Sequence, residues 1–243
     1  MPDNAFTWPT AVVPLPSDPE VDRFAVYYEN VCVRPSGPDT HDIGVAELRY
    51  DPDEGVDEPV QAEFLEPRLF EHGPEGWFGL SAMTHDGHAY VYRCPPSDGA
   101  CAVARAGLDR MADPAAYEYW GGEAWEANEA AATPMAMPDP SRRVKISVER
   151  VEALGVFVMA EHRQENGRYV DLRVARRPWG PWSAPAEIEL PECAGFYPEI
   201  CFAAEVHGHL SDGDTVALTW FDPGRDTESP TRFAQVPVEI AGR

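Results

Sequence analysis

The sequence predicts an all-β protein, a β-propeller with four blade modules in this chain. Three observations support this prediction: apolar strands recur with a period of about sixty residues, helix signals are few, and aromatic residues make up 11% of the chain. Aromatic side chains suit flat sheets that pack face to face. The main alternative is a β-sandwich or jelly roll, in which strands are similarly spaced but no such period is required.

Each predicted blade is a meander of about four short antiparallel strands. The hairpin in the middle of each unit begins near Val26, Tyr90, Val156 and Val216. A further strand is expected before each hairpin, in TWPTAVV, GWFGLSAMT, RRVKISVERV and GFYPEICFAA. We expect blades at approximately 7–70, 76–130, 142–190 and 195–240, within one domain spanning 1–243. Stacking between neighbouring blades would bury both faces of each small sheet.

Local helix signals are confined to LDRMADPAAYEYW and EAWEANEAAAT. Pro114 and the Gly121–Gly122 pair interrupt them, so neither is expected to form a long helix. The second stretch, with the loop TPMAMPDPS that follows it, is expected to link the second and third blades.

The chain is strongly acidic, with 42 acidic against 19 basic residues and a formal charge of −23. Such a surface repels phosphate backbones and anionic lipid, so we expect neither a nucleic-acid nor a membrane-surface partner. The N-terminal MPDNAFTWPTAVVPLP lacks a basic region and a clean apolar stretch, so no signal peptide is expected. No glycine-rich phosphate loop, zinc-like spacing or EF-hand spacing occurs, so we expect no cofactor and no metal site.

Five cysteines leave at least one unpaired within the chain. Cys94 and Cys101 flank a hairpin turn, and Cys193 and Cys201 flank another short loop. Two disulfides would form in an oxidising compartment. The alternative is that all five are small buried hydrophobic residues.

Two longer phrases carry a family resemblance. These are YVYRCPPSDGACAVARAGLDRMADPAAYEYWGGEAW and RRPWGPWSAPAEIELPECAGFYPEICFAAEVHG. In this order they resemble a family of five-bladed β-propeller proteins related to furanose-cleaving glycoside hydrolases, the endo-D-arabinanase-like proteins. The resemblance runs from about Trp8 to Asp222 and implies an extracellular enzyme acting on a polysaccharide or oligosaccharide.

Glycoside hydrolysis needs two carboxyl groups that flank the scissile bond, one of them a general acid. The resemblance implies that these acids sit at the starts of innermost strands, with an Asp on the first blade. This sequence departs from that pattern, since four blade units are visible and TWPTAVV opens the chain without such an Asp. The chain is therefore either catalytic with other acids or a fragment that lacks the first catalytic blade.

Candidate catalytic residues are acids on predicted strands: Glu199, Glu29 and Glu205. Glu199 is set among apolar neighbours in GFYPEICF, and desolvation there would raise its pKa as a proton donor requires. Glu205 and His207 are alternate residues of one strand and share a face, so they would form an acid–imidazole pair. The alternatives are a solvent-facing strand position for Glu199, the polar end of an edge strand for Glu29, and a surface loop for Glu205 and His207.

Candidate substrate-binding residues are Trp8, Trp77, Tyr197 and His207. The three aromatic residues would stack on sugar rings at the starts of inner strands, or else pack in the core. Together these features predict a glycoside-hydrolase-like protein acting on a furanose-containing polysaccharide of the arabinan or arabinogalactan type. The alternative is a non-catalytic carbohydrate-binding or structural propeller.

Overall fold

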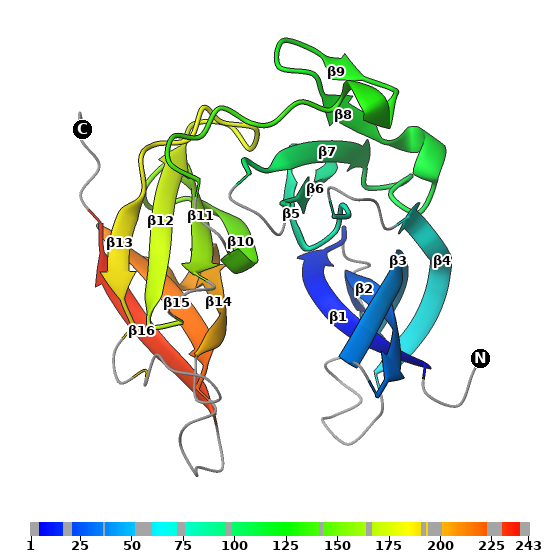
Figure 1. Cartoon of the computed structure of the whole chain (residues 1–243), viewed down its shortest axis with the longest axis horizontal. Coiled ribbons are helices and arrows are strands. Elements are labelled where there is room, and N and C mark those ends of the chain that lie inside the picture. The colour runs from blue at the N-terminus through cyan, green and yellow to red at the C-terminus, as the bar shows by residue number, and fades with distance from the viewer. Residues whose placement is uncertain are drawn as a thin grey trace. The chain divides into compact units, whose positions relative to one another are not determined.

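The computed structural model describes residues 5–16, 21–35, 37–51, 60–71, 76–95, 99–140, 143–163, 167–190, 193, 201–222 and 230–238. Within these ranges the chain forms sixteen strands and three short 3₁₀ turns, arranged in four sheets (Figure 1). In every sheet the strands follow one another in chain order and pair antiparallel, so each sheet is a meander. The predicted all-β propeller with four blade modules is confirmed.

The first sheet consists of β1 (Ala5–Pro14), β2 (Asp22–Arg34), β3 (Gly37–Tyr50) and β4 (Gln61–Glu71). The second consists of β5 (Ser81–His85), β6 (His88–Arg93), β7 (Ala102–Gly107), β8 (Glu118–Trp120) and β9 (Trp125–Glu126). The third consists of β10 (Arg143–Val151), β11 (Val156–Arg163), β12 (Tyr169–Ala175) and β13 (Ala186–Glu189). The fourth consists of β14 (Phe202–His207), β15 (Thr215–Phe221) and β16 (Thr231–Pro237).

The two stretches with helix signals contain only single 3₁₀ turns, at Pro114–Ala116 and Glu129–Ala131. The side chains of Asp113 and Asn128 cap these turns. Asp and Asn are favoured at such N-terminal positions, which explains the local helix signal in the sequence. The remainder of the first stretch forms β8, because its aromatic residues pack into the sheet. Tyr119 is buried there, and its ring lies 5.4 Å from that of Phe78.

The chain divides into two compact units. The first contains Met1–Cys94 and Ala102–Thr133, and the second contains Pro95–Cys101 and Pro134–Arg243. Each unit holds two of the four sheets and buries an apolar cluster of its own. The prediction of one domain over the whole chain therefore stays a prediction.

The core of the first unit lies between its two sheets and is rich in aromatic side chains. The Tyr27 and Tyr117 hydroxyls lie 3.1 Å apart in this core, and Tyr117 donates to the carbonyl of Met111 at 2.8 Å. Burial raises the pKa of Tyr27 to about 12, so both hydroxyls stay protonated and act as hydrogen-bonding groups. These hydrogen bonds satisfy polar atoms that would otherwise be costly to bury.

The core of the second unit is the apolar face shared by the β10–β13 and β14–β16 sheets. Its buried members come from both sheets: Val158, Ala160, Val170, Leu172, Ala204, Val206, Val216, Leu218 and Trp220. β-branched residues at alternate positions of a strand suit such a contact between sheets. This packing determines the position of the β14–β16 sheet against the β10–β13 sheet.

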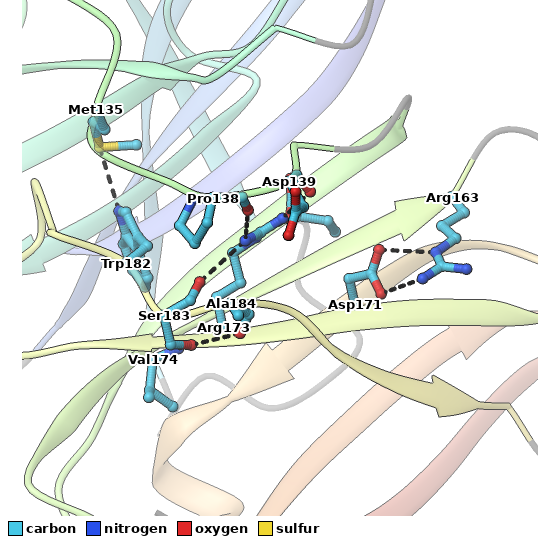
Figure 2. A network of polar contacts seen from close by, with 11 residues as sticks. Met135, Pro138, Asp139, Arg163, Asp171, Arg173, Val174, Trp182, Ser183 and Ala184 are labelled. Carbon is cyan, nitrogen blue, oxygen red and sulfur yellow. Dashed lines mark hydrogen bonds and ion pairs between the residues drawn. The ribbon is translucent and has the colours of Figure 1, made fainter. Parts of the chain in front are cut away.

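A buried arginine anchors the segment that leads into the third sheet. The Arg173 side chain is fully buried, and its guanidinium pairs with the equally buried Glu161 carboxylate. It also donates to the carbonyls of Pro138, Ser183 and Asp139, the last at 2.7 Å. Figure 2 shows Arg173 surrounded by these carbonyl groups. The planar fork of arginine makes several such hydrogen bonds at once, which a lysine ammonium does less well.

The same close-up shows how the outer end of the β11–β12 hairpin is held. Arg163 binds Asp171 through two hydrogen bonds of 2.8 and 2.6 Å, and Asp171 is buried (Figure 2). Near Arg173, the Trp182 indole donates to the Met135 sulfur at 3.4 Å. Polar contacts therefore hold this unit both at its hairpin end and along the segment before β10.

Arg173→Met is expected to lower the free energy of unfolding by about 3–5 kcal/mol, because it leaves a buried carboxylate without its cation. Urea denaturation measures this loss. The control is Arg168→Met, which removes an exposed ion pair with Glu189 and is expected to cost less than about 1 kcal/mol. Equal losses in the two variants would contradict the structural role of Arg173.

Candidate functional site

The candidate site lies along β10 and β14, the first strands of the two sheets in the second unit (Figure 1). The chain just after β14 approaches β10 closely. A Cβ added at Gly208 would lie only 2.1 Å from the carbonyl oxygen of Arg150. Only glycine allows this approach, which brings the end of β14 beside the end of β10.

Alternation along β10 places its polar side chains on one face. Lys145, Ser147 and Glu149 are partly buried, whereas the intervening Ile146 and Val148 are buried. Ser147 accepts a hydrogen bond from the backbone N–H of Val206 at 3.1 Å, so this face is turned toward β14. The arrangement collects one cation, one hydroxyl and one carboxyl group opposite the fourth sheet.

β14 contributes Glu205 and His207 to the same place. Glu205 forms an ion pair with Lys145 of β10, and its side chain is 43% exposed. Because the pair links strands of two sheets, it holds the Glu205 carboxylate near the polar face of β10. The partial exposure leaves this carboxylate within reach of a molecule from solvent.

Glu149 has the most strongly perturbed carboxyl group of the cluster. Burial, together with the negative charge of Glu205, raises its pKa from 4.5 to about 7. No hydrogen bond or ion pair joins Glu149 to another residue of the described ranges. A carboxyl group with this pKa holds its proton for about half of the time at neutral pH, which suits a general acid.

The imidazole of His207 lies next to this pair of carboxyl groups. Its Nε2 lies 2.7 Å from the Thr219 hydroxyl, and its ring meets that of His209 edge-on at 5.9 Å. Burial lowers the pKa of His207, Glu205 raises it and His209 lowers it further, with a net downward shift. A neutral imidazole can both donate and accept hydrogen bonds, so it suits the binding of substrate hydroxyl groups.

A β-bulge in β14 directs these side chains. Pairing with β15 shifts between Phe202 and Glu205, and Ala203 has a positive φ of 56°. A non-glycine residue in this left-handed region costs on the order of 1 kcal/mol. Bulges re-aim the side chains that follow them, and here the residue concerned is Glu205.

The structure brings two of the predicted site residues together, Glu205 and His207. Glu29 lies in the other unit, on β2 opposite Trp8 of β1, and accepts a hydrogen bond from Thr40 at 3.2 Å. Trp8 is 44% exposed on β1. Trp77 does not start an inner strand as expected. It lies before β5 and packs against the core of the first unit, because its neighbours form a turn there.

The other two candidates, Glu199 and Tyr197, lie outside the residues that the structure describes. Sequence reasoning missed Glu149 and Lys145. Their signal was the alternation in KISVE, where polar residues occupy every second position of a predicted strand. Only the packing of β14 against β10 reveals that this polar face meets Glu205.

The structure also bears on the cysteines and on metal binding. Cys193 and Cys201 form a disulfide with their Cα atoms 5.8 Å apart, Cys94 and Cys101 are disulfide-bonded too, and Cys32 is free. The disulfide alternative is thus favoured. Across the described part of the chain, no group of three or more His, Cys, Asp or Glu residues could hold a metal ion. Nor does any helix there have the length and apolarity to span a membrane.

Residues 54–220 match the family described as "Domain of unknown function (DUF4185)", and the chain belongs to this family. No curated protein matches the chain.

Several solved structures share the fold. A Bacteroides ovatus protein provisionally described as a hydrolase matches with a TM-score of 0.64 and 15% identity over 96% of this chain and 61% of its own. The family 117 glycoside hydrolase Zg3597 from Zobellia galactanivorans matches with a TM-score of 0.53 and 13% identity over 98% and 72%. The GH43_1 enzyme from Xanthomonas citri, complexed with xylose, matches with a TM-score of 0.50 and 14% identity over 91% and 67%. The chain thus spans 61% of the length of the Bacteroides protein.

These neighbours establish the fold, which is one that glycoside hydrolases use. They do not carry an activity over to this chain at such low identity. The chemistry of the chain therefore has to be argued from its own residues, above all from Glu149 and Glu205.

Glu149→Gln is expected to stabilise the protein increasingly as pH rises. The folded state favours protonated Glu149, so this contribution is complete below the ordinary pKa of 4.5 and is lost as pH rises through about 7. The difference in unfolding free energy between variant and wild type should therefore grow by roughly 1–3 kcal/mol from about pH 5 to about pH 8. Urea denaturation at the two pH values measures it. A difference that does not change with pH would mean that Glu149 has an ordinary pKa.

Proposed function

We propose that this protein hydrolyses glycosidic bonds in a furanose-containing polysaccharide of the arabinan or arabinogalactan type. The observation that carries this proposal is the proximity of Glu149 and Glu205 on neighbouring strands, where burial and the charge of Glu205 raise the pKa of Glu149 to about 7 and Glu205 forms an ion pair with Lys145. Two carboxyl groups with opposite tasks are what acid-assisted glycoside cleavage needs.

In this mechanism Glu149 is the general acid. Its raised pKa keeps a proton available near neutral pH, and that proton passes to the glycosidic oxygen as the carbon–oxygen bond breaks. Glu205, which forms an ion pair with Lys145, would face the positive charge that develops on the sugar ring. Water then adds its hydroxyl group to the sugar carbon and gives its second proton to a carboxylate. This assigns to Glu149 the role that the sequence predicted for Glu199.

The substrate class rests on the fold and on the resemblance to furanose-cleaving propellers. The Xanthomonas citri enzyme, which shares the fold, is complexed with xylose, a pentose like the arabinose units of arabinan. In this chain His207 would bind sugar hydroxyl groups. The disulfide-bonded cysteines support an oxidising setting, and the extracellular space, where polysaccharides are found, is one such setting.

A second candidate function is carbohydrate binding without hydrolysis. The observation that favours it is the ion pair between Lys145 and Glu205, which neutralises the second carboxylate of the pair. A propeller with one functional acid would still hold a sugar through its hydroxyl-binding and aromatic side chains.

Release of reducing ends from arabinan and arabinogalactan tests the first function. The wild-type protein should release them, and Glu149→Gln should lower the rate by about 100-fold or more, because the amide cannot donate a proton as an acid does. Retention of the full rate by Glu149→Gln would remove Glu149 from the mechanism.

The matched control is Glu152→Gln, which makes the same change three residues along the chain at a carboxylate that is 78% exposed. It should retain the wild-type rate. If the wild-type protein releases no reducing ends but is retarded in gels that contain the polysaccharide, the second function holds.

A further inference from the structure

Among the residues that the structure describes, β14 is the edge strand of its sheet, with β15 on one side only. The backbone N–H groups on its other side therefore lack partners within the sheet. Buried N–H groups of this kind need an acceptor, since leaving one unpaired destabilises the folded state.

Two side chains of the third sheet supply these acceptors. The Ser147 hydroxyl of β10 accepts from the N–H of Val206 at 3.1 Å. The Nδ1 atom of His162 on β11 accepts from the N–H of Ala204 at 3.1 Å. Ala204 and Val206 are alternate residues, and both are buried in the shared core. Side chains thus take the place of a neighbouring strand along this edge.

The protonation state of His162 follows from its contacts. His162 is fully buried, and its Nε2 lies 2.7 Å from the carbonyl oxygen of Gly167. A carbonyl oxygen only accepts, so Nε2 carries the proton and Nδ1 is free to accept from Ala204. Burial lowers the pKa of His162, which keeps this neutral tautomer in place.

Glu205 lies between these two hydrogen-bonded residues of β14. Ala204 and Val206 flank it directly, so the two hydrogen bonds fix the backbone on both sides of the Glu205 side chain. The Glu205 carboxylate is thereby kept beside Lys145 and close enough to Glu149 to act on it.

We propose that Ser147 and His162 are positioning residues, which clamp the edge of β14 so that Glu205 stays against Lys145 and Glu149. Neither residue needs to touch the substrate. The proposal rests on the proposed function for its role in catalysis, but the clamp itself is a statement about the position of Glu205. The charged or titratable groups at this cluster include Lys145, Glu205 and His207, with His209 beside His207 and His162 opposite Lys145 on β11.

The test is a ¹³C NMR titration of the Glu149 carboxyl carbon in protein with labelled glutamate. Glu205→Gln sets the reference, because it removes the charge of Glu205 and lowers the midpoint of the Glu149 titration. Ser147→Ala should lower this midpoint by about half of the reference shift or more, since Glu205 moves away once Val206 is released. Ser147→Thr keeps a hydroxyl group and should restore the wild-type midpoint.

His162 gives a second and independent pair of variants. His162→Asn keeps an acceptor near the position of Nδ1, whereas His162→Gln keeps a donor near the position of Nε2. The Asn variant should retain the Glu149 midpoint better than the Gln variant, because the bond to Ala204 positions β14. If Ser147→Ala leaves the midpoint unchanged, the clamp is overturned, whatever the His162 variants do.

Rates of polysaccharide cleavage separate this proposal from the proposed function. If Ser147→Ala lowers both the midpoint and the rate, and Ser147→Thr restores both, clamp and function are supported together. If the midpoint moves but the wild-type protein releases no reducing ends, the clamp stands and the proposed function fails. If the rate falls while the midpoint stays, the function stands and the clamp is overturned.

Discussion

The apolar contact between the β10–β13 and β14–β16 sheets is the constraint on which the candidate site depends. Residues such as Val158, Ala160 and Leu218 bury the shared face, and this burial brings the polar sides of β10 and β14 together. Glu149 acquires its raised pKa only because that contact both desolvates it and brings Glu205 near. The chemistry of the site is thus a product of sheet packing rather than of one strand.

Much of the fold was accessible from the sequence, because strand repetition is a local signal. The hairpins around Tyr90 and Val156 were predicted, and they form β6–β7 and β11–β12. The type of secondary structure was harder to predict where the local conformational preference of a segment differs from the conformation that its packing requires. The aromatic residues around Tyr119 follow a capped 3₁₀ turn, yet they form a strand because their rings enter the core.

The site was only partly accessible, for a different reason. Glu205 and His207 were predicted as a pair, since alternation within one strand can be seen in the sequence. Glu149 was missed, because its pKa is raised by Glu205 on β14, a strand of the next blade that lies more than fifty residues away in the chain. No pattern within RRVKISVERV shows which neighbour its polar face will meet. The buried Arg173–Glu161 pair was also missed. Arg173 is held by backbone carbonyls of a distant loop, and no sequence pattern shows such contacts.

The hydrogen bonds from β14 to Ser147 and His162 involve its main chain alone. Hydrogen bonds from backbone N–H groups depend on the path of the main chain and do not depend on which side chains β14 carries. The residues at positions 205 and 207 can therefore be substituted during evolution without losing these hydrogen bonds between the two sheets. Relatives that keep these hydrogen bonds can differ in the ligand they prefer and still have the same architecture.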